Sequence, residues 1–177
     1  FEAGHALEKR HCPIDGDKIK SCINCKSCSI MSGFGGAGAF SDGKYNITND
    51  FGGTLYEYIG RQKALELMKY VDTINMSHGG EGTKMYSTAG TDLKKVCLQN
   101  KLKLLDASVR HLGTDVNYVV LKNLYNEMKE HMDFFFDTPV EKIQVKEDGY
   151  TVSAKDAEYA CKKCIVSVGR SGSKWME

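Results

Sequence analysis

The 177-residue sequence predicts a mixed α+β (α/β) fold, and three patterns predict it. Two stretches, residues 54–75 and 114–131, repeat apolar side chains at the spacing of a helix that buries one face. Residues 137–154 alternate apolar and polar side chains about a Glu147-Asp148-Gly149 turn, which predicts a β-hairpin. The apolar run 164–168 ends at Gly169 and is typical of a strand buried on both faces.

Composition narrows the functional class. The chain carries 24 basic and 23 acidic residues, and this balance argues against a nucleic-acid partner, which usually requires a basic excess. No apolar run approaches the roughly 20 residues of a membrane helix, and no basic segment followed by an apolar core opens the chain. These features predict a cytoplasmic protein with no membrane partner. The length suits one domain or slightly more, with a core that needs no disulfides.

The first half of the chain is predicted to alternate loop and helix. Residues 1–50 are rich in Gly, Cys and Ser and are expected to form ordered loop, with the charge run Glu8–His11 as a solvated turn. A helix over 54–75 follows, with Thr54 or Gly53 as its cap, and then a loop over 77–90. Thr91 and Asp92 open a shorter helix that runs to about Lys101.

The second half is predicted to be a helix between strands. Residues 102–110 could continue the preceding helix, but a short strand is favoured. Thr114 is the expected N-cap of the helix that ends near His131. Its core side is expected to carry Val116, Val120, Leu121, Leu124 and Met128. A strand at Phe134–Phe136 then precedes the hairpin, and the run 164–168 is the last strand.

The cysteines suggest a metal site. Cys12, Cys22, Cys25 and Cys28 form a Cys-x9-Cys-x2-Cys-x2-Cys cluster, and two-residue spacing lets adjacent thiolates converge. Three in succession resemble the iron–sulfur run of ferredoxins, while any four could hold zinc. The alternatives are free thiols in a reducing cytoplasm and cysteines that oxidise to disulfides in isolation, and softness alone does not separate iron from zinc. Cys161 and Cys164 lead into the predicted last strand, where they would face opposite ways and chelate poorly.

The glycines of residues 33–38 match G-x-G-x-x-G, but the flanks do not suit a dinucleotide-binding turn. A strand should precede the glycines and a helix should follow. Here a cysteine-rich loop comes first and a poor helix start comes second. A loop of bare backbone that can lie against an anion is the better interpretation, and a flexible loop is the alternative.

Two further residues are candidates for ligand contact. Glu2, in Phe1-Glu2-Ala3-Gly4, suits the acidic end of a second Rossmann strand, which binds a ribose hydroxyl. His111 is followed closely by a glycine and a helix cap, so we place it near a ligand. The first and last residues of the sequence also lead us to expect a piece cut from a longer protein, with a tag-cleaved intact chain as the alternative.

Four motifs together resemble one family. The segment Gly33-Phe34-Gly35-Gly36-Ala37-Gly38-Ala39-Phe40-Ser41-Asp42-Gly43-Lys44 closely resembles the G-x-GGAG-x-FSDGKL loop of a family of largely uncharacterised bacterial FAD-dependent dehydrogenases. Glu2-Ala3-Gly4 is similar to its E-x-G strand end, and His111–Asp115 to its H-[IL]-GTD signature. Residues 165–171 are similar to its late A-x-G-x-S strand and turn.

The resemblance implies a site and a domain plan. Glu2 would bind the adenosine ribose, Val140 would neighbour the adenine, and His111, Thr114 and Asp115 would lie on the substrate side. The remaining cofactor contacts would come from Gly35, Gly36, Ala37, Gly38, Phe40, Ser41, Asp42, Gly43 and Lys44, and from Gly169, Arg170 and Ser171. Residues 1–50 would be an FAD-domain segment, 51–136 a mainly helical substrate-domain part, and 137–177 the hairpin and late strand of an incomplete Rossmann-like FAD domain.

The sequence departs from the family at two places. Tyr45 replaces the usual leucine, and Gly169-Arg170-Ser171-Gly172-Ser173 lacks the family histidine, so no catalytic acid or base is assigned. The leading expectation is a fragment of an FAD-dependent oxidoreductase that acts on a small molecule and is inactive by itself, with the use of NAD(P)H left open. The alternatives are a cysteine-ligated zinc or iron–sulfur module without flavin chemistry and an α+β domain with free thiols.

Overall fold

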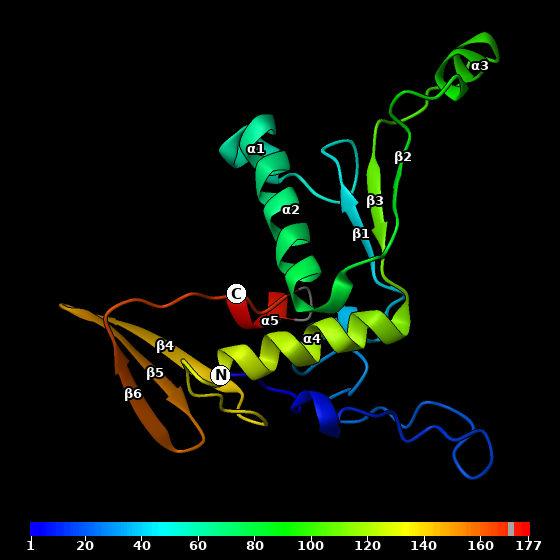
Figure 1. Cartoon of the computed structure of the whole chain (residues 1–177). Coiled ribbons are helices and arrows are strands. Elements are labelled where there is room, and N and C mark those ends of the chain that lie inside the picture. The colour runs from blue at the N-terminus through cyan, green and yellow to red at the C-terminus, as the bar shows by residue number, and fades with distance from the viewer. Residues whose placement is uncertain (170–171) are drawn as a thin grey trace. The chain divides into compact units, whose positions relative to one another are not determined.

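The computed structural model describes residues 1–169 and 172–177. The fold is mixed α+β, as predicted, with helices and two small antiparallel sheets (Figure 1). The chain forms two compact units, one of residues 38–130 and one that joins residues 1–37 to residues 131–177. The sequence placed its boundaries after residues 50 and 136.

The sheet of unit 38–130 has three short strands in the order β1-β3-β2. These are β1 (Lys44–Ile47), β2 (Met85–Ser87) and β3 (Ser108–His111), and both pairings are antiparallel. The strand predicted within 102–110 is thus present at its end, but β1 and β2 lie in segments predicted as loop. Three or four residues are too few for an alternating pattern, so only pairing with β3 makes these segments strands.

The predicted helix over 54–75 is two helices. Gly60 has φ 85° and ψ 151° and separates α1 (Leu55–Ile59) from α2 (Arg61–Asn75). Apolar periodicity runs through the break, which is why the sequence predicted one helix. The apolar side chains at helical spacing are not all buried, because Tyr58 is 83% exposed while Ala64 and Asn75 are buried. Thr54 occupies the N-cap position, but its side chain makes no capping hydrogen bond.

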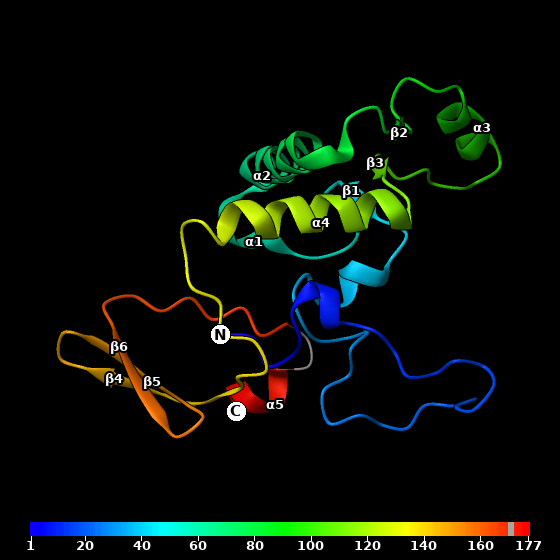
Figure 2. The same ribbon diagram turned by 60° about the horizontal axis from the view of Figure 1, so that its bottom comes forward.

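The helix over 114–131 is confirmed as α4 (Thr114–Met128). Val120 is fully buried, and the other four predicted core residues are half-buried. The N-cap is Gly113, not Thr114, and no side chain caps this end. The π-helical turn η3 (Met76–Gly80) extends α2 and packs on α4, as Figure 2 shows where the end of α2 meets α4.

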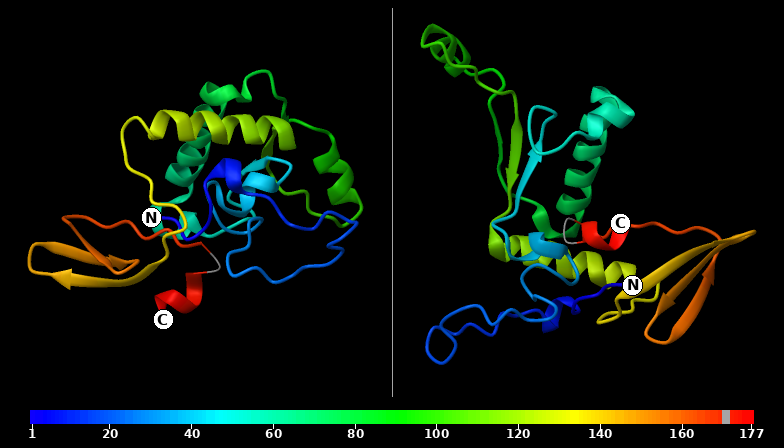
Figure 3. Two further views of the ribbon diagram at one scale, coloured as in Figure 1. Left: turned by 90° about the horizontal axis from the view of Figure 1, so that it is seen from below. Right: turned by 180° about the vertical axis from the view of Figure 1, so that it is seen from behind.

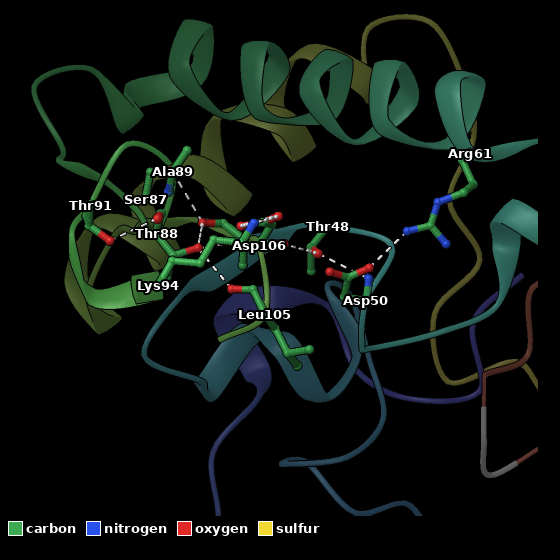
Figure 4. A network of polar contacts seen from close by, with 11 residues as sticks. Thr48, Asp50, Arg61, Ser87, Thr88, Ala89, Thr91, Lys94, Leu105 and Asp106 are labelled. Atoms are coloured by element: carbon green, nitrogen blue, oxygen red, sulfur yellow. Dashed lines mark hydrogen bonds and ion pairs between the residues drawn. The ribbon is translucent and has the colours of Figure 1, made fainter. Parts of the chain in front are cut away.

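A polar network links the residues that follow β1 to the start of α2 and to the connection between β2 and β3. Thr48 Oγ1 donates to the Asp106 carbonyl at 2.7 Å, and Asp50 pairs with Arg61 at the start of α2 at 2.9 Å (Figure 4). Lys94 of α3 (Leu93–Gln99), the short helix predicted between 91 and 101, pairs with Asp106 at 3.0 Å. These contacts fasten the long β2–β3 connection, which carries α3.

The sheet of the other unit is an antiparallel meander of β4 (Val140–Lys146), β5 (Gly149–Ala154) and β6 (Ala157–Cys161) (Figure 3). The predicted hairpin about Glu147-Asp148 is confirmed, because Lys146 pairs with Gly149. β6 was not predicted. Its turn consists of Lys155 and Asp156, with φ values of 47° and 60°. The usual sequence signal of such a two-residue turn is Asn-Gly, which this turn lacks.

Two predicted strands are absent from the described residues. Phe134–Phe136 is extended but belongs to no sheet; Phe134 and Phe136 stack at 5.6 Å, and Phe135 stacks on Phe1 at 4.8 Å. Residues 164–168 have no strand partner, and Ile165 is 91% exposed. A buried strand needs neighbours on both edges, and the described part of the chain supplies none. The short helix α5 (Ser173–Met176) follows.

Most of residues 1–43 is irregular, as predicted. It contains two short 3₁₀ helices, η1 (Leu7–Lys9) and η2 (Gly36–Phe40). Over residues 1–169 and 172–177, no helix combines the length and the apolarity that a bilayer crossing requires.

Candidate functional site

The start of the glycine loop is fastened by a buried arginine. Arg10 is 4% exposed, and its guanidinium donates to the carbonyls of Ser29 at 2.9 Å, Ile30 at 3.0 Å and Phe34 at 2.5 Å. Burial lowers the pKa of Arg10, while its electrostatic interactions with Glu2 and Cys28 oppose that shift. The prediction of a solvated turn over Glu8–His11 is therefore wrong at Arg10, since the carbonyls of a distant loop satisfy its donors.

The Glu2 side chain links the N-terminal segment, residues 1–4, to the same loop. Its Oε1 accepts hydrogen bonds from the backbone N–H groups of Gly4 at 2.7 Å and Gly33 at 3.0 Å. Gly4 and Gly33 lie in backbone contact with no room for a Cβ at either position. Glu2 also exchanges backbone hydrogen bonds with Phe135 and Thr138, so the chain leading into β4 lies beside it. The structure thus brings Glu2 close to the start of the strand that contains Val140.

In unit 38–130, two predicted motifs lie side by side. Leu112 N donates to Gly43 O at 3.0 Å, and Gly113 N donates to Asp42 O at 2.9 Å. Lys44 and His111 are directly paired in the β1–β3 register. The Ser41-Asp42-Gly43-Lys44 turn and the His111–Asp115 segment are therefore held together through their backbones.

The side chain of Asn117 binds the residues on either side of the Ser41–Lys44 turn. Its side chain is fully buried; Nδ2 donates to Gly38 O at 2.9 Å, and Oδ1 accepts from the Tyr45 hydroxyl at 2.9 Å. These partners lie 79 and 72 positions away in the sequence. Burial raises the pKa of Tyr45, so its hydroxyl stays a donor. Tyr45, which departs from the family pattern, thus has a specific partner here.

The exposed side of the same turn is charged. Lys44 pairs with Asp42 at 2.5 Å, and His111 Nε2 lies 3.9 Å from the same carboxylate. The hydrogen bond from Lys44, followed by the charges of Lys44 and His111, holds the pKa of Asp42 below its ordinary value. Thr114 and Asp115 follow at the exposed start of α4. This surface offers one carboxylate, one ammonium and one imidazole to a ligand.

The interior of the glycine loop is open. A Cβ added to Gly36 or Gly38 would meet no atom within 4 Å, and Gly35 and Gly36 have φ values of 81° and 57°. Side chains rarely adopt those backbone angles, so the backbone there stays bare. Among its neighbours, Phe40 and Ser41 are exposed, and the Ser41 hydroxyl donates to Gly38 O at 2.9 Å.

The structure describes only some of the residues that are predicted to contact a cofactor near the end of the chain. Gly169 is exposed with φ 63°, whereas Arg170 and Ser171 lie outside the described residues. The Val140 carbonyl accepts a hydrogen bond from the Trp175 indole at 2.8 Å. This contact occupies one backbone group of the residue expected near adenine.

The four cysteines of the predicted cluster surround one hollow. Cys12, Cys22, Cys25 and Cys28 all line a cavity of about 240 Å³ in the loop of residues 12–29. Within the described part of the chain, no three Cys, His, Asp or Glu side chains converge closely enough to hold a metal ion. All seven cysteines are free thiols.

The sequence missed Arg10 and Asn117, which hold the two ends of the glycine loop. For Asn117 the sequence did offer a signal, because it is a polar residue between Val116 and Val120 on the predicted core side of the helix. Comparison of the chain with family models, curated proteins and solved structures finds no match.

Proposed function

We propose that this chain is a segment of a cytoplasmic FAD-dependent oxidoreductase acting on a small molecule, with Glu2, the glycine loop and the Ser41–Lys44 turn on the cofactor side. The observation that carries the proposal is the backbone pairing of Asp42 and Gly43 with Leu112 and Gly113. Both motifs belong to the family that the sequence resembles. Their contact is expected if they serve one site, and it did not enter the sequence argument. The seven free thiols suit a reducing compartment.

The residues present fit a pyrophosphate-bearing cofactor. Gly36 and Gly38 leave open space beside their backbone, so an anion can approach this segment without obstruction by side chains, while the Gly36 N–H donates to Gly33 O at 2.8 Å. Within its own unit, Arg10 fixes the carbonyl of Phe34, and within the other unit Asn117 fixes the carbonyl of Gly38. Lys44 adds a positive charge next to the loop.

The division of labour follows from the chemistry. A bound flavin supplies the acceptor and donor of electrons, and the protein supplies binding, orientation and electrostatics. The backbone of residues 35–38 would face the phosphates, and the Glu2 carboxylate would face the ribose. His111 would lie on the substrate side, 3.9 Å from the Asp42 carboxylate, whose charge Lys44 balances.

The test is flavin binding by the chain expressed together with its flanking coding sequence. We expect a yellow protein with near-equimolar flavin, and a Gly38→Val variant that remains folded but loses most of the flavin. Gly38 has an ordinary φ and free space, so the variant obstructs the ligand and leaves the fold intact. The control is Ala89→Val, which places the same side chain at an exposed position with an ordinary φ in unit 38–130, outside the site. A colourless protein that gains no flavin band after FAD is added would contradict the proposal.

A further inference from the structure

The cysteine hollow is separate from the features used above. We infer that Cys12, Cys22, Cys25 and Cys28 bind a [4Fe–4S] cluster through four thiolates. The spacing of the cysteines and the lining of the hollow select the same four residues. The three remaining cysteines, Cys97, Cys161 and Cys164, do not line this hollow.

The loop that carries the cysteines is closed at its base. Arg10 stands two residues before Cys12, and its guanidinium binds the carbonyls of Ser29 and Ile30, directly after Cys28. The N–H groups of Met31 and Ser32 donate to Cys28 O at 3.0 and 2.8 Å, which fixes the backbone of the last cysteine. Cys12 and Cys28 are therefore held at the neck of the loop, while Cys22 and Cys25 lie on its exposed part.

The chain turns around Cys22 in a way that suits a sulfur ligand. Asn24 has φ 53°, and its backbone N–H lies 3.5 Å from Cys22 Sγ. A backbone N–H that points at a sulfur stabilises the thiolate and tunes the potential of an iron–sulfur cluster. Ile14 and Ile23 line the hollow although they are 41% and 56% exposed, so a cluster would give these apolar side chains a surface to cover.

The sequence of the cysteines favours a cluster over a single ion. All four line one cavity of about 240 Å³, and a four-iron cluster binds each thiolate at a separate iron, whereas a zinc ion draws four sulfurs to about 2.3 Å from one point. The Cys-x2-Cys-x2-Cys run is also the ferredoxin pattern.

The charge around the cysteine hollow suits a negatively charged cluster. Between Lys9 and Cys28 the sequence holds five basic and two acidic residues, and Lys18, Lys20 and Lys26 are exposed on the loop itself. A cluster with four thiolates carries net negative charge, which these side chains offset.

The test transfers a preformed [4Fe–4S] cluster, carried by four small thiolates, to the anaerobic 177-residue chain. Each cysteine gives up its proton and replaces one small thiolate, which leaves as a thiol, so the iron and sulfide oxidation states do not change. We expect four iron and four sulfide per chain and a visible absorption that bleaches on reduction with dithionite. The triple variant Cys22→Ser/Cys25→Ser/Cys28→Ser should lose nearly all of this iron.

The matched control is Cys97→Ser/Cys161→Ser/Cys164→Ser, which removes as many thiols outside the hollow and should load like the wild type. Far-ultraviolet circular dichroism before loading identifies any variant that has lost its fold. The proposal is overturned if folded wild-type chain takes up no cluster, if both triple variants load equally, or if the chain binds one zinc ion at these cysteines and excludes the cluster. None of these readouts involves flavin, so failure here is distinguishable from failure of the proposed function.

Discussion

Glycine, arginine and asparagine decide the shape of the glycine loop at the residue scale. At Gly33, φ is 116°, and an added Cβ would lie 2.6 Å from both Arg10 Cδ and His5 O. Arg10 and Asn117 each satisfy several backbone or hydroxyl groups from distant parts of the chain. The hydrogen-bond partners in these roles are not visible in local sequence, because each depends on which carbonyl or hydroxyl the fold delivers to the side chain.

Gly33→Ala should destabilise the fold by about 2–4 kcal/mol, since it combines a left-handed backbone with overpacking against Arg10. Gly38→Ala is the control; it has free space and an ordinary φ, and should change the free energy of unfolding by less than about 0.5 kcal/mol. Urea denaturation of the three proteins measures the difference. Equal midpoints would show that the contact between Gly33 and Arg10 is not tight.

At the scale of elements, an ion pair joins β3 to α2. Arg110 donates to both carboxylate oxygens of Asp72, at 2.9 and 2.8 Å, and to Thr83 O at 2.6 Å. The two side chains are only 14% and 12% exposed. The hydrogen bonds that Arg110 donates to Asp72 raise the pKa of Arg110, so this cation stays charged in its partly buried position.

Asp72→Asn should therefore cost roughly 3 kcal/mol, because it leaves a largely buried guanidinium without its counter-ion. Asp106→Asn is the matched control. It removes the pair with Lys94, whose partners are 55% and 60% exposed, and should cost no more than about 1 kcal/mol. Thermal unfolding of both variants provides the comparison, and similar losses would contradict the distinction between the buried and the exposed pair.

A histidine links η3 to α4. His78 Nδ1 lies 2.7 Å from Ile74 O, and Nε2 lies 2.7 Å from the Glu127 carboxylate. The Ile74 carbonyl, followed by Glu127, raises the pKa of His78 above its ordinary value of 6.5. The folded state therefore favours the protonated ring. This stabilisation is complete below the unfolded pKa and is lost as the pH rises through the folded one.

The stability of the wild type relative to His78→Gln should consequently decrease as the pH is raised from about 6 to about 8.5. Glu127→Gln removes one of the two groups responsible and should flatten part of this dependence. Melting temperatures across that pH range measure it. A wild-type advantage that stays constant with pH would show that folding does not raise the pKa of His78.

The whole chain buries few apolar side chains. Among the residues that the structure describes, eight hydrophobic residues are buried, whereas Tyr58, Tyr70 and Val71 of α1 and α2 are 83%, 62% and 41% exposed. Exposed apolar surface on this scale is typical of a face that contacts something else. The proposed segment of a larger flavoprotein is consistent with this exposure.

The isolated chain should accordingly bind the dye ANS in its folded state. Tyr58→Ser/Tyr70→Ser should lower the dye emission while leaving helicity unchanged, because both side chains face solvent. Emission from the wild type at the level of a well-packed domain would contradict the expectation of an accessible apolar face.

The sequence alone determined the α+β class, the helix α4 with its buried Val120, the hairpin of β4 and β5, and the grouping of four cysteines. Each depends on local spacing or turn chemistry, which one segment carries by itself. Tertiary structure decided the rest. The strands β1 and β2 exist through pairing with β3, the apolar run 164–168 lacks a partner among the described residues, and Gly60 divides a continuous apolar pattern. The contact between the Ser41–Lys44 turn and the His111–Asp115 segment also belongs to this group, since hydrogen bonds between distant backbones leave no trace in the spacing of side chains.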